Sequence, residues 1–367
     1  MPTKKASAPP PEAARRKALR AELKHRTLDA ALITNPVDIR YLTGFHGADS
    51  WLIVTPRRAI IVSDFRFAEE LDAVTGVTVV MRTGDIVTAA AAALQDAGAT
   101  LTALQSEHVT VSVRKRLAKE LGARALTDTT SLVSDLRLIK DAGEIRAIAK
   151  ATKIQEAALE AVLADLEPGI PEIELAAWLE FELKTRGSSE PAFDVIVAAK
   201  ANGSLPHAIP GKTKTAAGKP LLIDWGATVG GYRSDMTRTF SLGRWSRRMR
   251  EVYEVVLEAQ LAALDAIAPG VVMADVDAAA RDVIDEAGYA DRFGHGLGHG
   301  VGLDIHEAPR LARGSEGVLQ PGMVVTVEPG IYLPGVGGVR LEDLVVVTDR
   351  GSRNLSSLPK DLEWATR

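Results

Sequence analysis

The chain contains no cysteine among its 367 residues. Disulfide bonds and thiolate metal sites are therefore excluded, and any metal site must use histidine and carboxylate ligands. The sequence also lacks an apolar run approaching the roughly 18 residues of a membrane span. Residues 1–17 carry charge and proline but no apolar core of a signal peptide. We therefore expect a protein that makes no contact with membranes and resides in the cytoplasm.

The chain also lacks a large excess of either positive or negative charge. The 44 Lys and Arg residues stand against 48 Asp and Glu residues, which gives a formal net charge of −4. This balance provides no basic surface for nucleic acid or for an anionic membrane, so neither is an expected partner. With 46% hydrophobic and 25% charged residues, the composition is that of a globular protein. The length favours two domains.

The character of the chain changes twice along its length. Residues 1–12 are rich in proline and charge, and we expect them to form a disordered tail. Over residues 13–135, β-rich runs alternate with helical stretches, which predicts a small α/β domain with a mixed or parallel sheet. Residues 136–367 form the second predicted domain. It begins with long helical periodicity, and helices are expected at about 141–166 and 171–186.

The second predicted domain contains an internal repeat. The segment 166–178 (LEPGIPEIELAAW) returns as 267–280 (IAPGVVMADVDAAA), with an offset of 101 residues from Pro168 to Pro269. Each copy continues through a helix into a glycine-led apolar strand that ends in a carboxylate. Each then turns through further glycines to a second carboxylate. Such a repeat predicts two similar half-domains that place their carboxylates across a pseudo-two-fold axis.

The carboxylates of the repeat stand in apolar surroundings. Asp224, for example, follows the apolar run Leu221, Leu222 and Ile223, and Trp225 continues it. An unpaired buried charge is very costly, so this carboxylate must meet a cation. Five residues of ligand type follow one another along the chain: Asp224, Asp235, His299, Glu328 and Glu342. Carboxylates can span neighbouring ions, so this set predicts a hydrolase with two divalent metal ions.

Four of the seven histidines lie in two short stretches. His207 follows an apolar strand, and His295, His299 and His306 lie in a segment with a glycine at every second position from 294 to 302. Glycines let the backbone approach a ligand closely. We expect His299 to bind metal, and the other three to contact substrate and the tetrahedral intermediate.

Four further polar residues are interpreted from their positions. Arg340 precedes Glu342 by two residues, so strand alternation places both on one face, where Arg340 could clamp a ligating carboxylate. Asp343 then faces the other way and is expected to be structural. His46 and His108 are isolated, and we expect a surface histidine or a hydrogen-bonded one in each case.

At these residues the sequence resembles the pita-bread metallopeptidases, which include Xaa-Pro aminopeptidases, prolidases and methionine aminopeptidases, with creatinase as a metal-free branch. The stretches 37–45 (VDIRYLTGF) and 64–67 (DFRF) resemble the creatinase-type N-terminal domain. The resemblance implies an α+β fold. Its catalytic domain is a pita-bread domain, with duplicated α/β half-domains around a curved antiparallel sheet. A smaller α/β creatinase-like N-terminal domain precedes it.

The resemblance further implies the activity of a metal-dependent Xaa-Pro peptidase. The favoured interpretation is a dipeptidase (prolidase) that uses a water activated by two metal ions, Mn²⁺ in the first place and Zn²⁺ or Co²⁺ as alternatives. The substrate would be a proline-containing di- or oligopeptide, and the protein would be a homodimer. In this interpretation Glu328 carries the proton from water to the leaving nitrogen. His207, His295 and His306 handle substrate, and Arg340 supports the metal site.

Other functions stay open from the sequence. An Xaa-Pro aminopeptidase acting on longer peptides would differ only in how the far end of the cleft is closed. A non-catalytic binding module should have lost ligands, and none of the five is missing. A metal-free amidinohydrolase would be insensitive to chelators and would not need the carboxylates. The resemblance also suggests an interface charge pair that restricts the pocket to dipeptides, for which Asp38 and Arg40 are candidates.

Overall fold

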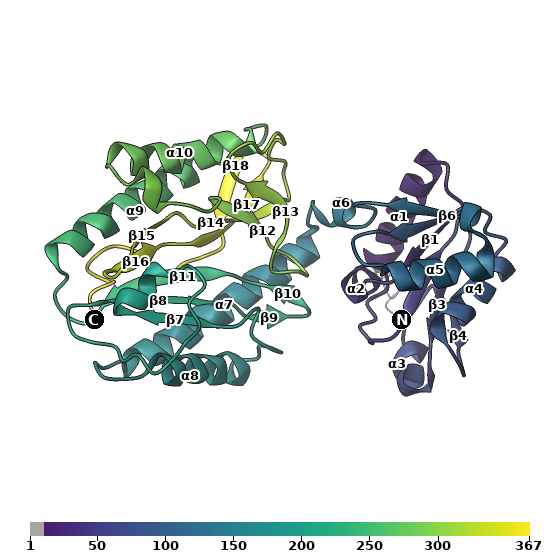
Figure 1. Ribbon diagram of the computed structural model, residues 1–367, viewed down its shortest axis with the longest axis horizontal. Helices are drawn as coiled ribbons and strands as arrows, with labels where there is room; N and C mark the ends of the chain where they lie inside the picture. The colour runs from purple at the N-terminus through teal and green to yellow at the C-terminus, as the bar shows by residue number, and fades with distance from the viewer. Residues whose placement is uncertain (1–10) are drawn as a thin grey trace, which may run out of the picture. The chain divides into compact units, whose positions relative to one another are not determined.

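The structure of the protein is a computed structural model and is described here for residues 11–367 (Figure 1). The described residues form two compact units, which divide between Arg137 and Leu138. Residues 1–10 of the expected disordered tail lie outside the described residues. Pro11 and Glu12, the last two residues of that expected tail, are instead the first residues of helix α1 (Pro11–His25).

The N-terminal unit is built on a six-stranded mixed sheet with the order β4-β3-β2-β1-β5-β6. The pairs β1–β5, β5–β6 and β3–β4 are parallel, and β1–β2 and β2–β3 are antiparallel. Its strands are β1 (Ala30–Ile33), β2 (Trp51–Val54), β3 (Ala59–Ser63), β4 (Thr78–Met81), β5 (Thr102–Gln105) and β6 (Leu126–Thr129). Its other helices are α2 (Pro36–Thr43), α3 (Ala68–Asp72), α4 (Ile86–Asp96), α5 (Val111–Leu121) and α6 (Ser134–Arg137).

Two polar residues singled out in the sequence have partners inside this unit. Asp38 is buried and accepts hydrogen bonds from Arg137 Nη1 at 2.9 Å and from Gln105 Nε2 at 2.6 Å. It therefore fastens α2 to α6 and β5, which argues against the interface role suggested for it. His108 is hydrogen-bonded as expected, because its Nδ1 lies 3.0 Å from the hydroxyl of Thr34.

Replacing Asp38 with alanine is expected to destabilise the N-terminal unit by about 3–5 kcal/mol, because the buried Arg137 guanidinium loses this carboxylate. Urea unfolding followed by fluorescence and circular dichroism measures the change. Arg58→Ala is the control: its ion pair with Asp96 is exposed and should contribute less than about 1 kcal/mol. Unchanged stability of Asp38→Ala, together with an altered preference between dipeptides and longer peptides, would restore the interface role.

The second unit contains two antiparallel sheets and two short hairpins. The first sheet has the order β11-β8-β7 and the second the order β13-β12-β14-β17-β18. The strands of the first sheet are β7 (Ile196–Ala199), β8 (Pro220–Trp225) and β11 (Met236–Ser241). Those of the second are β12 (Gly298–Gly300), β13 (Glu307–Leu311), β14 (Val324–Val327), β17 (Asp343–Thr348) and β18 (Gly351–Asn354). The hairpins are β9 (Thr228–Val229) with β10 (Tyr232–Arg233), and β15 (Gly330–Leu333) with β16 (Gly337–Arg340).

The internal repeat of the sequence is a repeat of structure. Helices α8 (Glu172–Thr185) and α10 (Met273–Glu286) begin and end 101 residues apart. In each half a helix pair is followed by a central strand, a short hairpin and a second strand that pairs with the central one, namely β8, β9–β10 and β11, then β14, β15–β16 and β17. The glycines that lead into the central strands, Gly218 and Gly322, both have positive φ (68° and 90°), which favours glycine.

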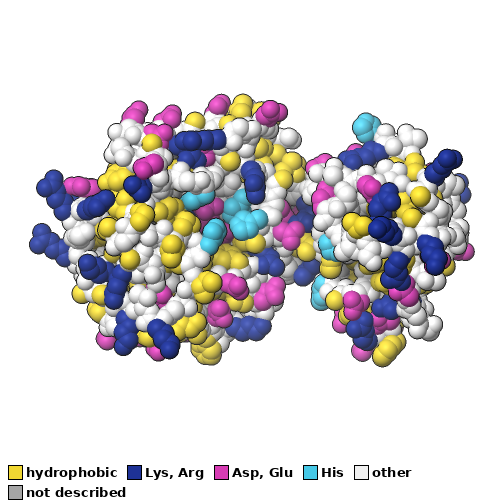
Figure 2. Space-filling view, in the orientation of Figure 1, with side chains coloured by type: hydrophobic (Ala, Val, Ile, Leu, Met, Phe, Trp, Pro, Cys, Tyr) yellow, Lys and Arg dark blue, Asp and Glu magenta, His cyan; other side chains and the backbone are white. Residues whose placement is uncertain are grey.

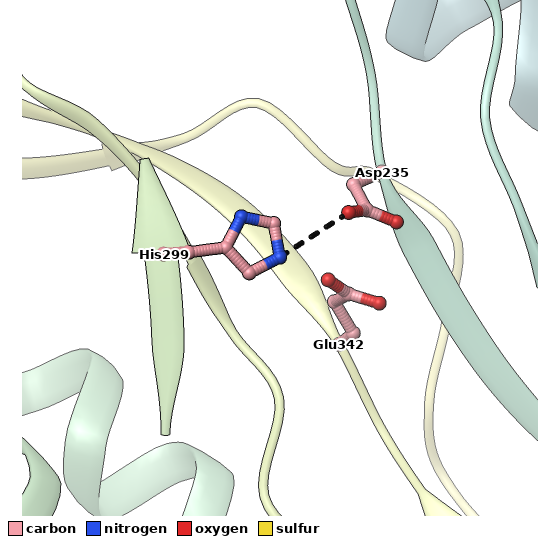
Figure 3. Close-up of side chains that lie close together, drawn as sticks. All are labelled: Asp235, His299 and Glu342. Carbon is pink, nitrogen blue, oxygen red and sulfur yellow. Dashed lines mark ion pairs between the residues drawn. The ribbon is translucent and has the colours of Figure 1, made fainter. Parts of the chain in front are cut away.

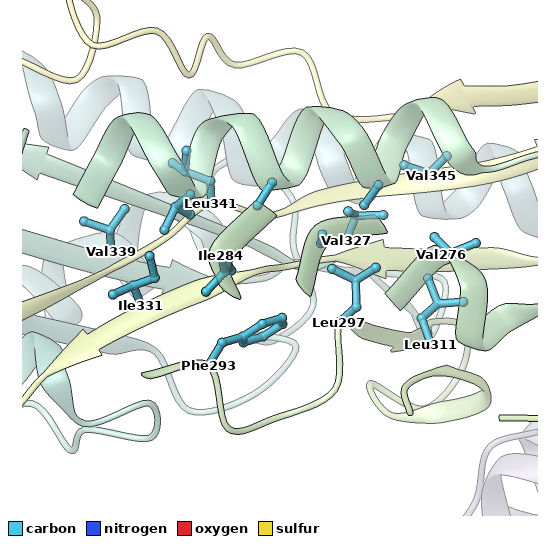
Figure 4. Packing of buried hydrophobic residues seen from close by; sticks show 14 of the residues in the cluster. Val276, Ile284, Phe293, Leu297, Leu311, Val327, Ile331, Val339, Leu341 and Val345 are labelled. Carbon is cyan, nitrogen blue, oxygen red and sulfur yellow. The ribbon is translucent and has the colours of Figure 1, made fainter. Parts of the chain in front are cut away.

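Each half has its own apolar core between its helices and its sheet. Helices α7 (Ala142–Ala164) and α8 pack on the first sheet, and α9 (Arg247–Ala266) and α10 pack on the second (Figure 1). Figure 4 shows the second core, where Val276 and Ile284 of α10 meet side chains from the strands, among them Val327. The sheets are thereby held between outer helices, and the ends of their central strands are free to carry polar groups.

None of the helices in residues 11–367 combines the length and the apolar character needed to cross a bilayer.

Candidate metal centre and substrate cavity

The four carboxylates of the repeat lie at equivalent ends of the paired strands. In the first half, β8 carries Asp224 near its end, and Asp235 immediately precedes β11. In the second half, Glu328 immediately follows β14, and Glu342 immediately precedes β17. The two halves join here, because the backbone N–H of Glu342 donates to the carbonyl of Thr237 at 3.1 Å. All four carboxylates therefore line one cavity.

His299 completes this group from strand β12. Ligand atoms of Asp235, His299 and Glu342 lie within 4.8 Å of one another (Figure 3). The Nε2 atom of His299 is 3.5 Å from Asp235 Oδ2 and 3.3 Å from Glu328 Oε1. Its Nδ1 lies 3.1 Å from the carbonyl of Gly300. A carbonyl can only accept, so Nδ1 carries a proton. Burial opposes a second proton, but the hydrogen bond and charge of Glu328 raise the pKa of His299, which favours a proton on Nε2 in the metal-free site. When that proton is lost, the Nε2 lone pair is free to bind a metal ion, as in a metal-binding histidine.

Two threonines orient the second half's carboxylates. Thr237 donates its hydroxyl to Glu342 Oε2 at 2.8 Å, and Thr326 donates to Glu328 Oε1 at 3.1 Å. Thr326 also accepts the backbone N–H of His299 at 3.0 Å, so one hydroxyl fixes both members of the His299–Glu328 pair. These hydroxyls leave the other carboxylate oxygens available to a cation.

Arg340 pairs with Asp224 at the edge of the group. Its Nη2 donates to Asp224 Oδ2 at 2.6 Å, its Nε to Thr237 Oγ1 at 2.8 Å and its Nη1 to the hydroxyl of Tyr332 at 3.0 Å. Asp224 Oδ1 and Glu342 Oε1 are buried and accept no hydrogen bond. A buried carboxylate oxygen without a donor calls for a cation, so the residues present fit divalent metal ions.

The pKa values of the group lead to the same conclusion. Burial raises the pKa of Asp235 and of Glu342 well above the usual range, and the neighbouring carboxylates raise both further. Burial would also raise the pKa of Glu328, but the hydrogen bond and charge of His299 lower it to about 2. Carboxylates this close cannot all ionise in a dry site unless a cation lies among them.

The cavity above the carboxylates has a volume of about 1040 Å³. His207, His295, His299 and His306 all line it, and Figure 2 shows histidine side chains gathered at a hollow in the surface of this unit. His306 packs edge-on against His299, with ring centroids 4.3 Å apart. Its pKa is lowered by burial and by the nearby His299, so its imidazole is neutral at pH 7. The rest of the lining is largely apolar and includes Phe193, Val195, Ile196, Pro206, Ile209 and Ile305.

His295 differs from the other cavity histidines. Its Nδ1 lies 2.8 Å from the carbonyl of Gly296, and its Nε2 lies 2.8 Å from the hydroxyl of Tyr332. Burial lowers its pKa. In a neutral His295, Nδ1 donates to the carbonyl and Nε2 accepts from Tyr332, so no ring N–H is left for substrate. A chain of contacts thus runs from Arg340 through Tyr332 to His295.

Tyr332, Thr237 and Thr326 were not among the residues predicted from the sequence. A signal for Tyr332 did exist in the glycines around it. Along the hairpin, Tyr332 pairs with Gly338, and Gly330 lies on the same face. A Cβ atom at Gly330 would lie 2.7 Å from the hydroxyl of Tyr332, so this position makes room for the tyrosine. A Cβ atom at Gly338 would first meet the carbonyl of Gly203, at 2.1 Å, and would lie 3.0 Å from the tyrosine ring. The threonines gave no signal, because threonine is common in strands.

The architecture and site together define a fold class. Two half-domains of one topology, joined so that both contribute carboxylates to a shared centre, form a pita-bread domain. Residues 146–349 match the profile of the metallopeptidase family M24, and residues 15–139 match that of the creatinase/prolidase N-terminal domain. The chain belongs to the metallopeptidase family M24, whose cofactors are divalent metal ions.

Known proteins similar to this chain agree with that assignment. The chain is 44% identical over 231 residues to an Xaa-Pro dipeptidase of Pyrococcus furiosus, an alignment that covers 63% of this chain and 66% of that protein. The solved structure of an Xaa-Pro dipeptidase from Bacillus anthracis superimposes with a TM-score of 0.93 at 38% identity, covering 96% of this chain and 99% of the other. An X-Pro aminopeptidase from Thermotoga maritima gives 0.88 at 33% identity, with coverage of 95% and 99%.

Proposed function

We propose that this protein is an Xaa-Pro dipeptidase that hydrolyses the peptide bond before proline. The observation that carries the proposal is a complete His and carboxylate centre in a cavity that three further histidines also line. The similarity to Xaa-Pro dipeptidases supports the choice of substrate. The apolar walls of the cavity suit a small peptide with a proline ring and an apolar neighbour.

The metal ions would be held by Asp224, Asp235, His299, Glu328 and Glu342. We propose two ions, Mn²⁺ in the first place, with Zn²⁺ or Co²⁺ as alternatives. Bound divalent ions lower the pKa of water and polarise a substrate carbonyl. Thr237 and Thr326 keep the ligating carboxylates in place, and Arg340 holds Asp224 through a short, buried hydrogen bond.

The proton transfers fall to side chains of this centre. Glu328 is ionised at neutral pH and lies 3.3 Å from His299 Nε2, among the proposed ligands, so it can take the proton of the attacking water and deliver it to the leaving nitrogen. The neutral imidazole of His306 can donate to the substrate carbonyl, and exposed His207 can line the proline pocket or donate near the scissile bond. We assign His295 to holding Tyr332, because both of its ring nitrogens already have partners.

The proposal is tested by measuring rates on an Xaa-Pro dipeptide and on an Xaa-Pro-Xaa tripeptide, each with Mn²⁺ and with a chelator. We expect cleavage of the dipeptide, loss of that activity with the chelator, and its recovery on addition of Mn²⁺. Dipeptide cleavage that persists after complete metal removal would contradict metal-dependent hydrolysis. Failure to cut either substrate with any of the three metals would favour a binding module.

The second candidate is an Xaa-Pro aminopeptidase acting on longer peptides. The similarity to the X-Pro aminopeptidase from Thermotoga maritima favours it. Efficient cleavage of the tripeptide in the same assay would establish this alternative. The proposal also includes a homodimer, which light scattering during size-exclusion chromatography would test.

A further inference from the structure

A buried lysine lies beside the loop that carries His306. Lys140 is only 1% exposed at its side chain, and its Nζ lies 2.7 Å from Oε1 of Glu307, whose side chain is 9% exposed. Glu307 is the residue after His306 and the first residue of β13. Lys140 itself stands just before α7, 167 positions away in the sequence (307 − 140). This ion pair therefore joins the start of the catalytic unit to the end of the His306 loop.

The lysine is fixed from the backbone side. Its N–H donates to the carbonyl of Gly322 at 2.9 Å. A Cβ atom at Gly322 would lie 2.8 Å from the Ile139 side chain and 3.1 Å from the carbonyl of Lys140, so the close approach requires glycine. The residue after Lys140, Asp141, caps helix α7 with a capping box to Glu144. The backbone of Lys140 is thus held in place on both sides, which fixes the position from which its ammonium group reaches Glu307.

The loop itself, residues 301–306, is tied at two places. At its start, the N–H of Arg233 donates to the carbonyl of Gly302 at 2.8 Å, and Arg233 Nε donates to that of Leu303 at 3.3 Å. At its end, the Glu307 carboxylate folds back over the loop, where Oε2 accepts the N–H of Asp304 at 3.5 Å. Oε1 lies against the bare Cα of Gly302, so closely that a Cβ atom there would collide with it.

We propose that Lys140 is a positioning residue: through its ion pair with Glu307 it fixes the 301–306 loop and thereby the imidazole of His306 beside His299. This inference rests on the proposed function, in which His306 contacts the substrate. Lys140 does not line the cavity, whereas its partner Glu307 does. A displacement of about 1 Å in a catalytic group can reduce the rate of a reaction by up to about 100-fold, even when the substitution lies elsewhere.

Two substitutions disturb the ion pair in different ways. Lys140→Met removes the ammonium and keeps most of the side-chain volume. Gly302→Ala keeps both charges but pushes the Glu307 carboxylate away from its place. Arg137→Met is the matched control. It removes the ion pair between Arg137 and Asp38, which is buried to a similar extent and whose two residues both lie in the N-terminal unit. Thermal unfolding of all three variants shows how much stability each one loses.

The first readout is the division of the effect between kcat and KM on an Xaa-Pro dipeptide. We expect kcat to fall about 10- to 100-fold in Lys140→Met and in Gly302→Ala. KM should stay within about threefold, because a group that acts in the transition state is displaced. Arg137→Met should keep its kcat even where it lowers the unfolding temperature.

The second readout is independent of activity. In the metal-free protein, the imidazole NMR signal of His306 should shift in both Lys140→Met and Gly302→Ala. The signal of His108, which lies in the N-terminal unit, should not shift in either variant. The proposal is overturned if both variants unfold at lower temperature but keep kcat and the His306 signal. If the wild-type protein cleaves no Xaa-Pro peptide, the proposed function fails, and the His306 signal alone decides the positioning role.

Discussion

Replacing Glu328 with glutamine is expected to lower kcat by about 10²- to 10⁴-fold, which is the range typical for loss of a general acid or base. Glutamine keeps the size of the side chain and its oxygen toward Thr326 but can neither take up a proton nor bear the charge that His299 faces. Steady-state kinetics on an Xaa-Pro dipeptide at saturating Mn²⁺ measures the effect.

The control for this substitution is Glu156→Gln. Glu156 is a buried carboxylate in the same unit that accepts hydrogen bonds from Ser357 and Leu358 and does not line the cavity. The Glu156→Gln enzyme should keep the wild-type kcat. Bound metal should be counted in the Glu328 variant, because a loss of metal would assign the effect to ligation and a full complement would assign it to proton transfer. A Glu328→Gln enzyme with more than about a tenth of the wild-type kcat would exclude the proton-carrying role.

Replacing Arg340 with methionine should destabilise the metal-free protein by about 3–5 kcal/mol. The substitution leaves Asp224 buried without the guanidinium that donates to it at 2.6 Å, and it also removes a donor to Tyr332. Burial already raises the pKa of Asp224, even though the charge of Arg340 opposes this. Urea unfolding of the metal-free variant, compared with wild type, gives the change in the free energy of unfolding.

Mn²⁺ should return part of that stability to the Arg340→Met variant, because a metal ion bound by Asp224 replaces the missing positive charge. The matched control is Arg281→Met. It breaks a buried ion pair in the same unit, and the carboxylate of that pair, Asp277, is not one of the proposed metal ligands. Its stability should rise with Mn²⁺ no more than that of wild type. Equal rises in both variants would show that Asp224 does not bind the added ion.

Much of the catalytic unit could be predicted from the sequence because the duplication repeats its signals. The helices expected at 141–166 and 171–186 run over Ala142–Ala164 and Glu172–Thr185. The repeated strand and carboxylate pattern singled out Asp224 and Glu328, which do line one cavity. Charged residues in otherwise apolar strands are rare without a function, so they stand out in a single sequence.

Part of what escaped prediction consists of contacts between distant parts of the chain. Thr237 and Glu342 are 105 residues apart, and Asp38 and Arg137 are 99 apart. No local pattern tells which of many arginines a given aspartate will meet, so the sequence leaves Asp38 as an interface candidate although it is buried in its own unit. Gly330 is different, because a glycine inside a strand is a local sign of a close neighbour, although it does not tell which side chain that is.

The two halves differ at the strand that pairs with the central one. Strand β12 pairs with the central strand β14 and carries His299, whereas β7, which pairs with the central strand β8, carries only apolar residues from Ile196 to Ala199. Both Ile196 and His299 face the same cavity. Both halves thus supply carboxylates, but at this strand the second half supplies a histidine and the first an apolar wall. A symmetric pair of identical halves would have offered either two such histidines or two apolar walls, but not one of each.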